Sequence, residues 1–179
     1  ALIQLFLERC DDFGGVPVFY EISSEHLHRY ADVGLTFVKL GEEAGVDLAS
    51  FNTDGARGKK FRQVLHRLER THATFRVLAV EEVPGVLEEL RAVSDDWLTR
   101  HAGAEKGFSL GFFAADYMVR FRVAVIEQEG RIVAFANLWE GPHHMELSLD
   151  LMRYDARAPK EVMEALLVQV MLWGKSEGY

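Results

Sequence analysis

The most regular alternation of apolar and polar residues lies in residues 130–155, and it predicts two strands joined by a turn. Residues 132–139 are apolar at nearly every position, a pattern typical of a strand that is buried on both faces of a sheet. Gly141 and Pro142 then predict the turn. We expect the rest of the chain to be arranged around these two strands.

The second of these strands, expected over residues 145–152, has one apolar and one polar face. Glu146, Ser148 and Asp150 lie opposite the methionine and leucines at positions 145, 147, 149 and 151. Arg153 follows Asp150 by three residues, where we expect regular structure to end. A polar face in a segment otherwise suited to burial indicates a reactive site at this strand end.

The remaining pattern predicts an alternation of helices and strands. We expect helices at residues 2–10, 26–31, 58–70, 86–97 and 159–173, strands at residues 16–22, 35–40, 75–80 and 121–128, a short helix or turn at residues 116–120, and a loop with two glycines at residues 105–111. The predicted fold class is therefore α/β (α+β), with mixed, mainly antiparallel sheets and flanking helices.

The helix expected over residues 58–70 is strongly basic. Its apolar positions form one stripe, and around that stripe stand Arg57, Lys59, Lys60, Arg62, Arg67 and Arg70, with Glu69 as the one acid. Six basic residues and one acid give this segment a net charge of +5, whereas the whole chain carries −8. The pattern fits a solvated helix face and a phosphate-binding face for tRNA or lipid headgroups about equally well.

Composition limits the possible classes of protein. With 179 residues, 49% of them hydrophobic and 27% charged, the chain can form a packed core with a polar surface. The net charge of −8 argues against a surface that binds nucleic acid throughout. One cysteine, Cys10, excludes an internal disulfide and a cysteine-based zinc site. We find no apolar run of membrane-spanning length and no signal peptide, and we expect the sequence to be a fragment of a longer protein.

The order of elements from residue 75 onward, strand, helix, three antiparallel strands and helix, is that of the Gcn5-related acyltransferase fold. That fold usually holds acyl-coenzyme A in a glycine-rich turn, whose backbone N–H groups and helix N-terminus bind the pyrophosphate. Here the corresponding turn, residues 153–159, contains no glycine, and side chains there would obstruct a close approach of the backbone to the ligand. We therefore expect a donor other than coenzyme A, and no cofactor.

The run EKGFSLGFF…DY…VAV…GRIVAFANLW…ELSLDLMRYD, with the upstream RGKKFR and the closing MLWGKSEGY, resembles the catalytic region of the multiple peptide resistance factors. These are bacterial aminoacyl-phosphatidylglycerol synthases, integral membrane proteins with a cytoplasmic C-terminal domain. The resemblance is most specific in the second half of the chain. It implies tandem acyltransferase-like units: residues 1–56 as the end of a first unit, 57–74 as a basic connecting helix, and 75–179 as the beginning of a second unit.

The resemblance also implies a function and a set of site residues. An amino acid, lysine or alanine, would pass from aminoacyl-tRNA to phosphatidylglycerol at the cytoplasmic face of the bacterial membrane, which gives resistance to cationic antimicrobial peptides; a transmembrane region would lie outside this chain. Asp150 and Arg153 match the acidic and the basic residue of the family's catalytic DLMR motif, here residues 150–153, and Tyr117 matches a tyrosine of the aminoacyl pocket. Lys59, Lys60, Arg62, Arg67 and Arg70 are the candidate phosphate contacts.

The chemistry of these side chains suits the implied reaction, although other interpretations stay open. Asp150 could hold the α-ammonium of the aminoacyl ester, while Arg153 or Tyr117 could stabilise charge developing on its carbonyl. Asp150 and Arg153 could instead form a local ion pair. The chain could also belong to a Fem-type transferase with another acceptor, or to a binding module without catalysis. His143 and His144 form an exposed turn more readily than a metal site, so we expect no metal.

Overall fold

The computed structural model describes residues 2–101, 105 and 111–179. The expected loop at residues 105–111 therefore lies largely outside the described residues, with Glu105 and Gly111 inside them. The chain divides into two compact units, residues 1–45 and residues 46–179. Each unit is described by itself.

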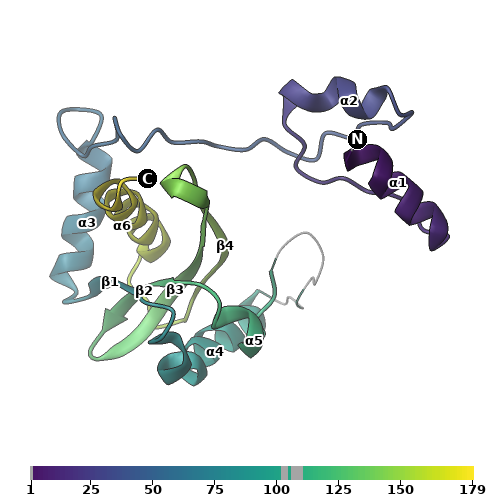
Figure 1. The fold of residues 1–179 in the computed structure, drawn as a ribbon. Helices are drawn as coiled ribbons and strands as arrows, with labels where there is room; N and C mark the ends of the chain where they lie inside the picture. Colours follow the sequence, from purple (N-terminus) through teal and green to yellow (C-terminus); the bar gives the residue numbers. More distant parts are fainter. Residues whose placement is uncertain (1, 102–104, 106–110) are drawn as a thin grey trace. The chain divides into compact units, whose positions relative to one another are not determined.

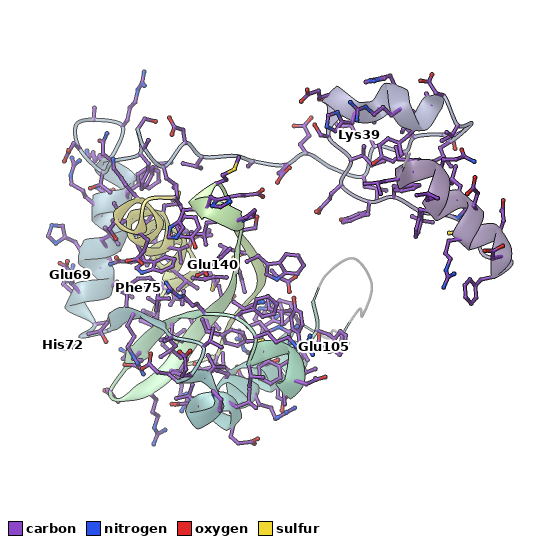
Figure 2. All side chains as sticks on the ribbon, viewed as in Figure 1. Lys39, Glu69, His72, Phe75, Glu105 and Glu140 are labelled. Carbon is purple, nitrogen blue, oxygen red and sulfur yellow. The ribbon has the colours of Figure 1, made fainter. Side chains whose placement is uncertain are left out.

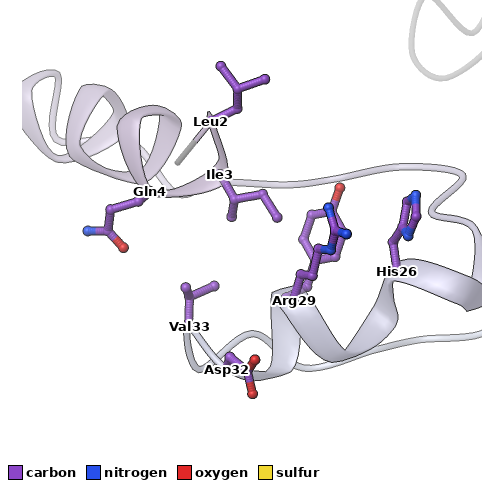
Figure 3. A pocket seen from close by; sticks show the side chains of 8 residues that line it. Leu2, Ile3, Gln4, His26, Arg29, Asp32 and Val33 are labelled. Carbon is purple, nitrogen blue, oxygen red and sulfur yellow. The ribbon is translucent and has the colours of Figure 1, made fainter.

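The first unit contains α1 (Leu2–Asp12), the 3-10 helix η1 (Ser24–His26) and α2 (Leu27–Ala31) (Figure 1). Phe19 joins α1 to α2 through edge-on contacts, with ring centroids 5.2 Å from Phe6 and 4.9 Å from Tyr30. An open hollow of about 570 Å³ lies between the two helices (Figure 3). It is lined by the aliphatic side chains of Leu2, Ile3 and Val33 and by Gln4, His26, Arg29, Tyr30 and Asp32. None of the described residues of this unit is buried.

The strands predicted at residues 16–22 and 35–40 are wrong, because both segments lack strand structure. A strand is stable when its backbone pairs with a neighbour and one face is covered. Neither condition holds within the described residues of this unit, where the side chains of Val16 and Val38 are 86% and 78% exposed. The two predicted helices, by contrast, form from local hydrogen bonds and appear in α1 and α2.

The second unit holds a four-stranded sheet and its helices. Its elements are α3 (Lys59–Arg70), β1 (Thr74–Leu78), α4 (Val83–Arg100), α5 (Ala115–Met118), β2 (Val123–Gln128), β3 (Arg131–Glu140), η2 (Pro142–His144), β4 (Leu147–Tyr154) and α6 (Val162–Glu177). The strands lie in the order β1-β2-β3-β4, and every neighbouring pair is antiparallel. The predicted mixed α/β fold with an antiparallel sheet and flanking helices is confirmed here.

Two hydrophobic clusters cover the two faces of this sheet. On one face, α6 and α3 pack against Ala124, Ile126 and Leu138. On the other face, α4 and α5 pack against Val125 and Phe135. Strand β3 contributes to both clusters and is buried from Ile132 to Leu138, as its continuous apolar pattern predicts.

The basic helix α3 packs inside the second unit. Leu68, on its apolar stripe, is 4% exposed and belongs to the same cluster as Val162 and Leu166 of α6. The division between the compact units after residue 45 does not coincide with the predicted boundaries after residues 56 and 74. The arrangement as two tandem acyltransferase-like units stays a prediction.

Strand β4 differs from its predicted form at the position that matters most for the site. Its regular structure does not end between Asp150 and Arg153 but continues to Tyr154. The pairing with β3 shifts register: Leu138 lies opposite Leu149 and Ala136 opposite Met152. Two residues of β4 therefore stand opposite one residue of β3, which defines a β-bulge.

This bulge corrects the predicted face assignment of β4. Leu147 and Leu149 pack on the α6 side of the sheet, as alternation predicts, but Leu151 belongs to the cluster on the α4 side. The extra residue reverses the order in which later side chains alternate, and a local pattern does not reveal such a change.

None of the helices in the described part of the chain combines the length and apolar character that a membrane span requires.

Candidate active site

Asp150 lies in the bulge of β4, half-buried on the α4 side of the sheet. Its Oδ1 accepts a hydrogen bond from the backbone N–H of Gly111 at 2.8 Å, and its Oδ2 accepts one from the Tyr117 hydroxyl at 2.5 Å. The indole Nε1 of Trp139 donates to the Tyr117 oxygen at 3.1 Å. The structure thus brings together Asp150 and Tyr117, two of the predicted site residues.

The surroundings of Tyr117 keep its hydroxyl protonated. Burial raises the pKa of Tyr117, and its hydrogen bond to Asp150 raises that pKa further, because a phenolate would lie against a carboxylate. The Trp139 N–H, which donates to the same oxygen, opposes this rise only in part. At neutral pH Tyr117 is therefore a hydrogen-bond donor and not a base.

Gly111 is required by the close approach of the backbone to the carboxylate. A Cβ atom at this position would lie 1.9 Å from Asp150 Oδ2 and 2.9 Å from the Tyr117 hydroxyl oxygen. No side chain fits into this space without moving the carboxylate. In the sequence Gly111 is one of two glycines in an expected loop, and its contact with Asp150, 39 residues further along the chain, depends on the tertiary structure.

Arg153 lies on the same side of the sheet, in a separate ionic cluster. Its Nη1 and Nη2 donate to the two carboxylate oxygens of Glu105, each at 2.8 Å, and Nη1 also donates to the hydroxyl of Ser94 at 2.5 Å. The guanidinium lies 5.2 Å from the ring centre of Trp97, and the side chain is 5% exposed. This is the bidentate geometry in which arginine binds carboxylates most strongly.

The alternative of a local ion pair between Asp150 and Arg153 is wrong for the described residues, in which no salt bridge joins the two. Glu105 is the partner of Arg153, and the guanidinium holds the pKa of Glu105 below its usual value. Glu105 also accepts a hydrogen bond from the backbone N–H of Phe113 at 3.1 Å. The segment from Gly111 to Phe113 is therefore held by two carboxylates, Asp150 and Glu105.

The predicted phosphate contacts lie elsewhere. Figure 2 shows Glu69, on α3, and Glu105 at opposite sides of the second unit. Arg62 donates to the backbone carbonyls of Thr53 and Gly55, and Arg67 is paired with Glu161. Both side chains thus have partners within the protein. Helix α3 lies on the α6 side of the sheet, so the structure does not place its basic residues next to Asp150.

A cationic hollow of about 420 Å³ lies where the end of α3 meets the start of α6. It is lined by Arg67, Arg70, Thr71, Pro159 and Lys160. Arg67 is paired with Glu161, so Arg70 and Lys160 supply the local positive charge at this hollow, on a protein with a net charge of −8. Lys59 and Lys60, at the other end of α3, are exposed.

The turn between β4 and α6 uses its backbone N–H groups internally. The N–H of Ala156 donates to Asp96 at 2.8 Å, and the N–H of Arg157 donates to the side chain of Asp155, also at 2.8 Å. The N–H of Ala158 donates to the backbone carbonyl of Asp155 at 3.2 Å. In a pyrophosphate-binding turn, such N–H groups would donate to the ligand. Here they donate to carboxylate and carbonyl oxygens of the protein.

His143 and His144 belong to the exposed 3-10 helix η2. His144 Nδ1 lies 2.9 Å from the carbonyl oxygen of Glu177, and its ring stacks on Tyr179 with centroids 4.5 Å apart. Among the described residues no three histidine, cysteine or acidic side chains are grouped so that they could hold a metal ion.

Comparison with known proteins extends over the whole chain. The family model described as "Phosphatidylglycerol lysyltransferase, C-terminal" matches residues 1–179. The chain belongs to this family. A phosphatidylglycerol lysyltransferase from Bacillus subtilis is 41% identical over 178 residues, and one from Staphylococcus aureus is 30% identical over 179 residues. These alignments cover 99% of this chain but 21% of each relative, so the chain spans about a fifth of their length.

Two solved structures share the fold of this family member. The structure of L-PGS from Bacillus licheniformis superposes with a TM-score of 0.89 at 44% identity. The C-terminal domain of an Agrobacterium fabrum protein superposes with a TM-score of 0.92 at 42% identity. Each match covers 99% of this chain and 56% of the solved chain.

Replacement of Gly111 by alanine is expected to destabilise the protein, because the new methyl group would displace the Asp150 carboxylate. Overpacking of this kind costs about 1–3 kcal/mol in the free energy of unfolding. Gly85→Ala is the matched control: this glycine lies in α4 with no atom within 4 Å of the added Cβ. There, stability should stay the same or rise by up to about 1 kcal/mol. Urea denaturation measures both, and equal stability of the two variants would contradict the close contact at Gly111.

The stabilising effect of Glu105 should depend on pH. Because its pKa is lowered in the folded protein, the carboxylate stabilises the fold above the ordinary glutamate value of 4.5, and this contribution is lost as the pH falls through the lowered pKa. The difference in unfolding free energy between the wild type and Glu105→Gln should therefore be largest near neutral pH and shrink in acid. Denaturation curves from neutral pH down into acid measure it. A constant difference would show that Glu105 does not stabilise the fold through its charge.

Proposed function

We propose that the protein containing this chain transfers an aminoacyl group, lysine or alanine, from aminoacyl-tRNA to phosphatidylglycerol. The observation that carries the proposal is the Asp150–Tyr117–Gly111 cluster, in a chain that matches phosphatidylglycerol lysyltransferases from end to end. The similarity to phosphatidylglycerol lysyltransferases favours lysine as the amino acid. The chain forms part of a catalytic region that works at the cytoplasmic face of the bacterial membrane.

Asp150 binds the α-ammonium group of the aminoacyl donor. Its carboxylate accepts hydrogen bonds from a neutral hydroxyl and a backbone N–H, and no salt bridge joins it to a cation among the described residues. A half-buried carboxylate with such neighbours keeps its negative charge available for a ligand cation. Charge-assisted hydrogen bonds of this kind are roughly twice as strong as neutral ones, so they suit recognition of an ammonium group.

The transfer itself is an ester exchange. The hydroxyl oxygen of the glycerol headgroup attacks the carbonyl carbon of the aminoacyl ester, and a new ester bond forms. The bond to the ribose oxygen of the tRNA breaks, and that oxygen ends with the proton that the glycerol hydroxyl loses. Tyr117 is protonated and donates its single hydroxyl hydrogen to Asp150. When the ammonium group binds Asp150, this hydroxyl turns its hydrogen to the ester carbonyl oxygen and stabilises the negative charge that develops there.

Arg153 has a supporting role in this proposal. Its positive charge is compensated by Glu105, and its side chain is buried against Trp97. A compensated, buried guanidinium stabilises a developing oxyanion less than an uncompensated one would. Arg153 instead holds Glu105, which holds the backbone of Phe113 and so the segment that begins at Gly111.

The basic residues of α3 and the cationic hollow serve the phosphates of the two substrates. Because they lie on the face of the sheet opposite Asp150, they contact tRNA or lipid headgroups away from the reacting ester. Electrostatic attraction to phosphate is long-ranged enough for this role at low ionic strength. In this proposal the chain contains parts of two tandem acyltransferase-like units, and a transmembrane region of the same protein lies outside this chain. The lipid modification gives resistance to cationic peptides.

Asp150→Asn is expected to reduce transfer about ten- to a hundredfold, because it removes a charge-assisted hydrogen bond worth roughly 1.5–3 kcal/mol. Its melting temperature should move little, since the side chain is half-buried and shape is preserved. The assay is formation of a ninhydrin-positive phosphatidylglycerol derivative by the full-length protein, with tRNAs charged one amino acid at a time. A variant that melts earlier but keeps full transfer would show that Asp150 is structural.

The double substitution Lys59→Glu and Lys60→Glu is expected to weaken binding to anionic vesicles or to tRNA at low salt, with the difference shrinking as salt is raised. It changes the local charge by four units and leaves Arg62 in place. Arg62 donates hydrogen bonds to residues 53 and 55, so its replacement could disturb the fold as well as the charge. Glu43→Lys with Glu81→Lys, outside α3, is the control that adds positive charge. Affinity unchanged in the first variant would make this end of α3 a solvated surface.

A further inference from the structure

Asp150 and Arg153 lie on the same side of the sheet, although they are three positions apart in β4. In a regular strand, side chains three positions apart point to opposite faces. Here Asp150 contacts Tyr117 of α5, while Arg153 contacts Ser94 of α4. Both helices pack on the same face, and the bulge in β4 is what makes this possible.

Asn137 is the residue of β3 that stands opposite the bulge. It is 0% exposed, and its side-chain Oδ1 accepts a hydrogen bond from the backbone N–H of Leu151 at 2.7 Å. In a regular antiparallel ladder this N–H would donate to a backbone carbonyl. At the bulge the ladder is interrupted, and the side-chain amide of Asn137 provides the acceptor instead.

The amide is a costly group in this position. Its Nδ2 is buried and makes no hydrogen bond of good geometry among the described residues, although the amide lies close enough to Tyr117 to lower the pKa of that hydroxyl. A buried donor without a partner costs roughly 1–3 kcal/mol, which an aliphatic residue would avoid. In β3, Phe135 packs in the cluster on the α4 side of the sheet, and Trp139 donates a hydrogen bond to Tyr117 on the same side. Asn137 lies between these two residues in the alternation of β3, so it faces the α4 side as well. The side-chain hydrogen bond that Asn137 makes with good geometry is the one accepted by its oxygen.

We propose that Asn137 is a positioning residue for the transferase reaction: by accepting the Leu151 N–H it holds the bulge, which keeps Asp150 in place against Tyr117 and Gly111 and brings Arg153 to the same face. This inference rests on the proposed function for its effect on catalysis. Its structural part, the dependence of the bulge on the Asn137 oxygen, stands independently of that function.

The test compares four variants of the full-length protein. Asn137→Leu has a similar size but no acceptor, and Asn137→Ala serves if the leucine variant fails to fold. Asn137→Asp keeps an oxygen in place, because burial favours the neutral carboxylic acid. Leu138→Ala is the control: its side chain is 1% exposed and lies on the opposite face, so it destabilises the core without removing the acceptor. Hydrogen exchange of the Leu151 amide and the kcat and KM for phosphatidylglycerol are measured for each.

In Asn137→Leu or Asn137→Ala, exchange at Leu151 should rise at least about tenfold, as expected for a lost hydrogen bond. The kcat should fall about a hundredfold, a typical effect of misplacing a catalytic group by an ångström, with KM for the lipid little changed. Asn137→Asp should keep most of both properties, and Leu138→Ala should keep kcat even where it lowers stability.

Unchanged protection of Leu151, or a kcat within twofold of the wild type, in the variants without an acceptor would overturn the proposal. An equal loss in Asn137→Asp would also overturn it, because residue 137 would then act by packing alone. If the wild-type protein forms no aminoacylated phosphatidylglycerol, the proposed function fails, while exchange at Leu151 still decides whether the Asn137 oxygen holds the bulge.

Discussion

The antiparallel pairing of β3 with β2 and β4 is the interaction on which the second unit depends. β3 is buried on both faces, so neither helix layer can form its cluster without it. Phe135 belongs to the cluster beneath α4, while the neighbouring Ala134 and Ala136 belong to the cluster beneath α6. Burial of apolar area on both sides of one strand makes the two layers a single cooperative core.

The site uses this rigid strand as its support. Trp139, near the end of β3, donates to Tyr117, and Asn137 lies opposite the bulge that contains Asp150. Catalytic groups placed on a paired strand are held more precisely than groups on a loop. Gly111 is in turn fixed by its contact with Asp150 on this strand pair.

Asp150 and Arg153, the two charged residues of the segment 150–153 (DLMR), have different electrostatic environments. Arg153 is buried and compensated by Glu105, and removing either partner would leave the other charge in a poorly solvated position. Asp150 is half-buried and held by neutral donors. A short motif thus supplies one charge that stabilises local structure and one that is available to a ligand. The basic residues of α3, on the other face of the sheet, contribute positive potential without neutralising Asp150.

The sequence by itself determined most elements of the second unit, the basic residues around the apolar stripe of α3 and the residue types of the site. These features follow from local periodicity and composition. The tertiary structure decided that residues 16–22 and 35–40 form no strands, that Glu105 is the partner of Arg153, and that Gly111 contacts Asp150. It also decided the bulge at Asp150. The face to which each β4 side chain points depends on the register with β3, and register is a property of the strand pair that no local pattern in one strand contains.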